Sequence, residues 1–208
     1  LVIANEFFDA LPIRQYVKTA RGWCERMVVM KDGKLDLALA PLPTPNAAIP
    51  ASRAGAPEGG FYEVSPAATA LGEEIGRGIA SYGGAALFLD YGYADTGFGE
   101  TFQAVGAHRF THPLDEPGRR DLSAHVDFTA LAGAARHGGA EIFGPVPQGE
   151  FLERLGIAAR ARTLAKANPA EADAVTTALQ RLTAPQQMGK LFQAMALLPP
   201  SATPPPGF

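Results

Sequence analysis

Polar side chains that could perform chemistry occur in three clusters, each at or just beyond the end of a short apolar stretch. They are, in chain order, Asn5, Glu6 and Asp9; Asp90 and Tyr91; and His125 and Asp127. Carboxylates bind cationic groups strongly and can orient a nitrogen nucleophile, and a histidine can act as a general base. The three clusters are therefore the candidate catalytic and binding residues.

Each cluster also fits a structural role. Glu6 or Asp9 can cap the turn that leads to Pro12, and Asp127 precedes an apolar helical pattern in a position suited to an N-cap. Asp90 can mark the end of a strand before a turn glycine. Residue type and spacing alone leave both interpretations open.

Other arrangements give weaker signals. His108, His112 and Asp115 lie in an irregular region and complete no metal-binding motif, so no metal site is predicted. The single cysteine, Cys24, excludes a cysteine cluster. There is no Gly-x-Ser-x-Gly sequence, which argues against a hydrolase with a nucleophile elbow.

Two apolar runs must position the first two clusters. Residues 1–5 (LVIAN) and 85–92 (AALFLDYG) are typical of strands buried on both faces. Between them, Ser65-Pro66 predicts the start of a helix that ends at Gly83-Gly84. Strand, helix and strand form a βαβ unit with a parallel sheet, which places both polar ends on the same, ligand-binding edge.

The rest of the chain predicts further elements of both kinds. Asp32-Gly33 predicts a hairpin within an antiparallel region at 14–40, with strands near 14–19, 23–30 and 34–39, followed by a loop at 41–60. The later elements are a helix after Asp127, strands at 140–146 and 190–197, helices at 149–155 and 158–167, a helix with a capping box at 168–171, and a proline-rich tail at 199–208.

The composition narrows the class of protein. The 208 residues are 47% hydrophobic and 19% charged, with a net charge of -3, which is typical of a globular domain. No basic block suggests nucleic-acid binding, and no apolar run reaches the ~18 residues of a membrane span. One cysteine suits a reducing compartment such as the bacterial cytoplasm.

Several segments, in this order along the chain, resemble one family. They are ANEFFDALP (4–12), EVSP (63–66), LFLDYG (87–92), TFQAV and His108, DLSAHVDF (121–128), GPVPQGEFLERLGI (144–157) and MGKLFQAMAL (188–197). The sequence is similar to the MidA-like S-adenosylmethionine-dependent methyltransferases. That family includes the mitochondrial complex I assembly methyltransferase, which modifies an arginine of a complex I subunit.

The resemblance implies an α/β fold: the C-terminal portion of a class I, Rossmann-like methyltransferase sheet, with the 14–40 hairpin as an elaboration of a single domain over 1–208. It implies S-adenosylmethionine as cofactor and a protein substrate. Glu6, Asp9, His125 and Asp127 would then be catalytic and Asn5 cofactor-binding, while Asp90 and Tyr91 would bind substrate. The expected function is arginine methylation linked to respiratory complex assembly.

The family's N-terminal half, with its glycine-rich donor loop, has no counterpart in these residues. We therefore expect the chain to match the C-terminal half only, to be inactive alone, and to need the missing half as partner. The alternative is a non-catalytic interaction or assembly protein. The expected compartment is the bacterial cytoplasm, or the mitochondrial matrix if the protein is eukaryotic.

Overall fold

The structure, a computed structural model, describes residues 1–45, 49–94, 99–106 and 109–208. Its internal contacts divide the chain into two compact units. Unit 1 comprises Leu1–Asp9, Ala68–Asp95 and His125–Phe208, and unit 2 comprises Ala10–Ala67 and Thr96–Ala124. The assignment of 1–208 to one domain stays a prediction, and each unit is described by itself.

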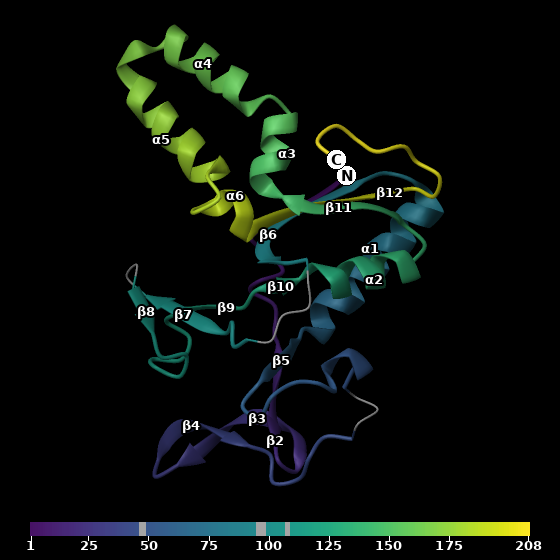
Figure 1. Cartoon of the computed structure of the whole chain (residues 1–208), viewed down its shortest axis with the longest axis vertical. Coiled ribbons are helices and arrows are strands. Elements are labelled where there is room, and N and C mark those ends of the chain that lie inside the picture. Colours follow the sequence, from purple (N-terminus) through teal and green to yellow (C-terminus); the bar gives the residue numbers. More distant parts are fainter. Residues whose placement is uncertain (46–48, 95–98, 107–108) are drawn as a thin grey trace. The chain divides into compact units, whose positions relative to one another are not determined.

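Unit 1 is built on a mixed sheet (Figure 1). Its strands, in spatial order, are β1 (Val2–Asn5), β6 (Ala86–Tyr93), β12 (Phe192–Leu198) and β11 (Glu141–Pro147), and the short β10 (Val126–Asp127) also pairs with β6. β1 and β10 run parallel to β6, whereas β12 is antiparallel to both β6 and β11. The parallel pairing of the two apolar runs is thus as predicted.

Two helices of unit 1 pack together unusually closely. α1 (Pro66–Tyr82) and α2 (Phe128–His137) lie side by side in Figure 1. A Cβ atom added to Gly76 would lie 2.4 Å from the Ala135 carbonyl oxygen. Because real Cβ atoms do not approach that closely, the two backbones can meet here only through glycine.

The remaining helices correct two predictions. They are α3 (Gln148–Arg154), α4 (Ile157–Ala167), the 3₁₀ turn η3 (Pro169–Glu171), α5 (Ala172–Thr183) and α6 (Met188–Leu191). The capping box at 168–171 is wrong: these residues form the 3₁₀ turn, without a side-chain cap. The strand predicted at 190–197 starts only at Phe192, because Lys190 and Leu191 belong to α6.

Burial differs sharply between the strands of this sheet. β12, with neighbours on both sides, is buried from Phe192 to Leu197. In β6 the side chains alternate, so that Phe88 and Asp90 share the fully buried face. The prediction that β1 is buried on both faces is wrong: Ile3 is 65% exposed. Among the described strands, β1 pairs with β6 alone, and an edge strand keeps one side open.

Unit 2 contains two antiparallel sheets and a 3₁₀ turn, η2 (Ala51–Arg53), within the predicted loop. The larger sheet has the order β4 (Lys34–Leu39), β3 (Gly22–Lys31), β2 (Arg14–Thr19) and β5 (Phe61–Val64). The smaller has the order β8 (Arg109–Thr111), β7 (Gln103–Gly106) and β9 (Asp121–Ser123). Asp32 and Gly33 both adopt positive φ, of 49° and 75°, as a tight two-residue hairpin turn requires.

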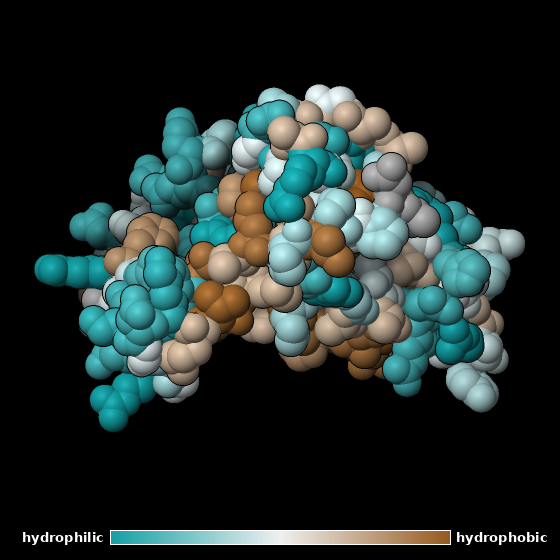
Figure 2. All heavy atoms as spheres, turned by 90° about the horizontal axis from the view of Figure 1, so that it is seen from below, coloured by the Kyte–Doolittle hydropathy of each residue, from teal (hydrophilic) through white to brown (hydrophobic). Residues whose placement is uncertain are grey.

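Apolar side chains remain exposed on the ribbon that β3 and β4 form. Cross-strand pairing places Val28 and Leu37, and likewise Met30 and Leu35, on one face. Met30 is 68% exposed. Figure 2, turned by 90° from the view of Figure 1, shows apolar patches between hydrophilic side chains on the surface.

Candidate functional site

The turn that follows β1 carries the first cluster of candidate residues. Glu6 still belongs to the sheet through its N–H, which donates to the Leu89 carbonyl oxygen of β6 at 2.9 Å. Its φ of 48° lies in the left-handed region, which is uncommon for a residue other than glycine, and the backbone turns sharply there. Phe8 then anchors the turn, because its buried ring packs on Phe88 with centroids 4.7 Å apart.

Asp90 holds this turn from the neighbouring strand. Its Oδ2 atom accepts hydrogen bonds from the backbone N–H groups of Phe7, Phe8 and Asp9, at 3.0, 2.9 and 3.3 Å. Its Oδ1 atom accepts from the Tyr91 N–H at 3.0 Å. The residue is 0% exposed. Both oxygens of this predicted substrate ligand are thus engaged by the backbone.

A second carboxylate lies close to this buried one. Burial, together with the negative charge of Asp9, raises the pKa of Asp90 to about 6, although the three backbone N–H donors act in the opposite direction. The Oδ1 atom of Asp9 is itself buried and has no hydrogen-bond partner among the described residues. A buried carboxylate oxygen of this kind is suited to a donor from a bound cationic group.

Of the third cluster, His125 contacts the side chain of Tyr91 in β6. Tyr91 follows Asp90, and successive strand side chains point to opposite faces. The rings of Tyr91 and His125 form a T-shaped pair, with centroids 5.4 Å apart and planes at 90°. Asp127 has the structural role that was considered for it, because its Oδ1 accepts from the Ala130 N–H at 2.9 Å and caps α2.

The structure therefore brings Asp9 and Asp90 together, and separately His125 and Tyr91. Asn5 and Glu6 are exposed at the end of β1. Within the described ranges, no group of three or more His, Cys, Asp or Glu residues is arranged to hold a metal ion. His108, which was considered for such a site, lies outside the described residues.

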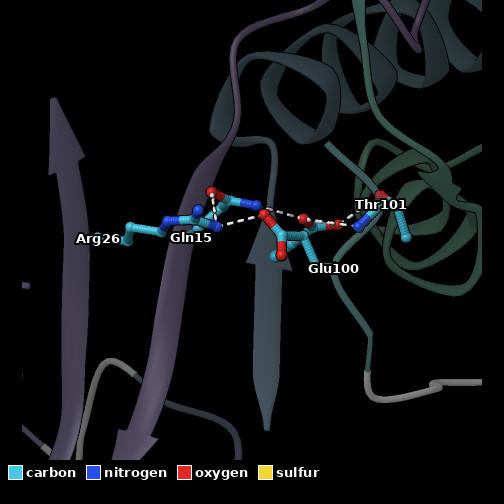
Figure 3. Close-up of polar contacts among 5 residues, drawn as sticks. Gln15, Arg26, Glu100 and Thr101 are labelled. Atoms are coloured by element: carbon cyan, nitrogen blue, oxygen red, sulfur yellow. Dashed lines mark hydrogen bonds and ion pairs between the residues drawn. The ribbon is translucent and has the colours of Figure 1, made fainter. Parts of the chain in front are cut away.

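Sequence reasoning missed a polar cluster in unit 2 that is built around two buried side chains, Gln15 and Glu63 (Figure 3). Glu63, in β5, accepts from the Gln15 side-chain amide at 2.7 Å, and from both the N–H and the hydroxyl of Thr101. Arg26 donates to Gln15 at 3.5 Å and pairs with Glu100. The only signal was a polar residue at an inward position of a short strand, since Glu63 stands between Tyr62 and Val64.

In the part of the chain that the structure covers, no helix is both long and apolar enough to cross a bilayer.

A family model described as "Putative S-adenosyl-L-methionine-dependent methyltransferase" matches residues 1–146 of the chain. The chain belongs to this methyltransferase family. The assignment confirms the family-level expectation from the sequence, and with it S-adenosylmethionine as the cofactor of the family. The matched range includes all three candidate clusters.

Curated relatives of the chain are roughly twice as long as the chain itself. The mouse protein named "Protein arginine methyltransferase NDUFAF7, mitochondrial" is 38% identical over 204 residues, which make up 96% of this chain and 46% of the mouse protein. The human protein of the same name is 37% identical, over 95% of this chain and 45% of its own length. The chain spans about half the length of these relatives.

Two solved structures share the fold. An uncharacterized superfamily protein from Burkholderia thailandensis superimposes with a TM-score of 0.84 at 31% identity, covering 95% of this chain and 54% of that one. A superfamily member from the same organism, bound to S-adenosyl-homocysteine, gives a TM-score of 0.82 at 31% identity, covering 95% of this chain and 52% of the other. The mixed α/β fold of a methyltransferase is therefore shown.

Proposed function

We propose that the chain is part of a protein arginine methyltransferase and that the turn after β1 binds the guanidinium of the acceptor. The observation that carries the proposal is the buried Oδ1 atom of Asp9, which has no partner among the described residues. It lies just beyond the carboxyl end of a parallel strand, where open α/β sheets bind their ligands. The names of the mouse and human relatives support arginine as the acceptor.

For methyl transfer, the protein must bind the guanidinium, align it with the methyl donor and accept the proton that the guanidinium loses. S-adenosylmethionine supplies, when bound, a methyl group on a sulfonium. Glu6 and Asp9 bind the guanidinium through charge-assisted hydrogen bonds and keep its positive charge away from the attacking nitrogen. Asn5, at the end of β1, holds the amino-acid end of the donor. Alignment of acceptor and donor contributes most to such a transfer.

His125 and Tyr91 are proposed to remove the proton that the guanidinium loses during methyl transfer. The His125 imidazole accepts the proton that the guanidinium loses, and the T-shaped contact with the Tyr91 ring keeps the imidazole in orientation. Asp127 fixes the start of α2, two residues after His125 in the chain. Tyr91 thus contributes to the substrate side through His125.

Substitution of the two carboxylates tests this function. Glu6→Gln and Asp9→Asn, introduced into a protein of the relatives' full length, are expected to lower methyl transfer to an arginine peptide about 10- to 100-fold each, since each replaces a carboxylate by a neutral amide and so removes the charge from the hydrogen bond to the guanidinium. Mass spectrometry of the peptide gives the rate. The matched controls are Glu153→Gln and Asp173→Asn, which alter exposed helix residues. Unchanged rates in Glu6→Gln and Asp9→Asn would disprove the role.

We also propose that the active enzyme contains a region equivalent to the rest of the relatives and that this region pairs with β1. The Val2 and Glu6 N–H groups donate to β6, so by alternation those of Ile3 and Asn5 face the open edge. That region would be the N-terminal half of the protein, with this chain as the C-terminal half, and it would complete the donor site. The proposed compartment of the enzyme is the bacterial cytoplasm or, in a eukaryote, the mitochondrial matrix.

Calorimetry with S-adenosylmethionine tests this second part. The chain alone is expected to bind the donor weakly and to be inactive, and a protein that carries the additional region is expected to bind it. Equal affinity in both would contradict the proposal. If neither binds, a non-catalytic role in complex assembly becomes the better account.

A further inference from the structure

The Asp90 side chain binds backbone N–H groups and is not placed to bind a ligand. Its side chain is 0% exposed, and its two oxygens accept four backbone N–H groups, three of them from the turn after β1. The turn and Asp90 are more than 80 residues apart in sequence. A substrate would have to displace these donors to reach the carboxylate, which disfavours direct binding.

The buried Asp90 carboxylate and the turn that it holds lower the free energy of unfolding, so a functional reason for them is expected. Glu6 keeps a left-handed backbone conformation that side chains other than glycine rarely adopt. A carboxylate is buried at Asp90 beside the negative charge of Asp9. Strained backbone and unfavourably placed charge of this kind are concentrated at functional sites.

We infer that Asp90 is a positioning residue: it fixes the backbone of residues 7–9, and so the direction in which Glu6 and Asp9 present their carboxylates. This inference rests on the proposed function. The carboxylate gathers successive N–H groups on one oxygen, which sets the orientation of successive peptide planes. The Cα–Cβ bond of Asp9 follows from those planes, and Phe8 is directed onto Phe88 by the same constraint.

Amide hydrogen exchange on the chain itself tests whether Asp90 holds the turn. In the wild type, the Phe7 and Phe8 N–H groups are expected to be protected, whereas the Asn5 N–H, which faces the open edge, exchanges freely. Asp90→Ala is expected to reduce the protection of Phe7 and Phe8 at least about tenfold. Asp90→Asn keeps a carbonyl oxygen and is expected to retain part of it. The matched control is Asp173→Asn, an exposed residue of α5.

If the Phe7 and Phe8 N–H groups of the wild type exchanged as fast as the Asn5 N–H, the inference would be overturned. This outcome does not depend on whether Asp90→Ala folds. Protection in Asp90→Asn equal to that in a folded Asp90→Ala would also count against it, because the retained oxygen would then hold nothing. Each of these outcomes is independent of methyl transfer.

Kinetics in a protein of the relatives' full length separates positioning from mere folding. A shift of about 1 Å in a reacting group can lower a rate about 100-fold. Asp90→Ala is therefore expected to lower kcat by up to about that factor while KM for S-adenosylmethionine stays unchanged, with partial rescue in Asp90→Asn. An unchanged kcat in a folded Asp90→Ala would refute positioning. Absence of transfer in the wild type would contradict the proposed function alone, and the exchange experiment would still decide whether Asp90 holds the turn.

Discussion

The Asp90 carboxylate has hydrogen-bond donors for both oxygens, yet its burial as a charged group is still unfavourable. Its oxygens are fully hydrogen-bonded, yet burial beside Asp9 raises its pKa to about 6. Backbone dipoles offset only part of the cost of removing a charge from water. The residue that faces it across the sheet in β12, Gln193, is neutral and offers no compensating charge.

The raised pKa predicts a defined pH dependence of stability. Between its ordinary pKa of 3.8 and about 6, Asp90 holds a proton in the folded state and loses it on unfolding. Its contribution to stability is therefore complete below about pH 4 and is lost as the pH rises through about 6. Relative to Asp90→Asn, the free energy of unfolding of the wild type should fall by roughly 3 kcal/mol over this window.

Urea denaturation of the wild type and Asp90→Asn at a series of pH values measures this difference. The comparison cancels the titration of all the other carboxyl groups. Asp9→Asn provides a second check, because removal of the neighbouring charge should move the transition to lower pH. Parallel pH profiles for the wild type and Asp90→Asn would show that Asp90 titrates normally.

At the scale of elements, the contact of α1 with α2 gives a sharp test of packing. Gly76→Ala places a methyl group 2.4 Å from the Ala135 carbonyl oxygen, so the helices must separate. We expect a loss of about 1–3 kcal/mol in the free energy of unfolding. Gly78 lies in the same helix with nothing within 4 Å of its would-be Cβ, and Gly78→Ala should stabilise by up to about 1 kcal/mol. Thermal unfolding that ranked the two alike would contradict this account.

The elements that sequence reasoning identified correctly are those with local causes. The Asp32-Gly33 turn depends on two adjacent residues that accept positive φ, and the start of α2 depends on Asp127, three residues before its donor. Burial of β1 could not be read in this way, because it depends on how many strands lie beside it. The capping box at 168–171 failed because a local 3₁₀ turn competed successfully for the same residues.

The candidate site was predictable only in part for the same reason. The composition of the turn singled out Glu6 and Asp9, but the role of Asp90 depends on hydrogen bonds across more than 80 residues of sequence. Glu63 was missed altogether, because its donor Thr101 is 38 residues away. Long-range partners of this kind leave no periodic pattern in a single sequence.

At the scale of the whole molecule, the open edge of β1 predicts self-association. Val2 and Ile3 of β1, and Leu1 just before it, are 39%, 65% and 90% exposed. Among the described residues, no strand pairs with the outer edge of β1. A lysine on such an edge opposes pairing. Ile3→Lys should therefore lower concentration-dependent association of the chain, measured by sedimentation velocity.

Leu164→Lys, which changes an exposed leucine of α4, is the matched control and should associate like the wild type. Equal association of Ile3→Lys and the wild type would show that β1 is not the contact. A reduction in both variants would point to general charge repulsion instead.

The position of β12 in the sheet determines when the core of unit 1 can form during protein synthesis. β12 separates β6 from β11, and each of those strands precedes it in the chain. While a ribosome is still translating residues 192–198, the strand that joins β6 to β11 is absent, and Phe88 does not yet have Met195 opposite it. This core can therefore close only after β12 has been synthesised, and nascent chains that stall earlier would expose the open sides of β6 and β11 to chaperones.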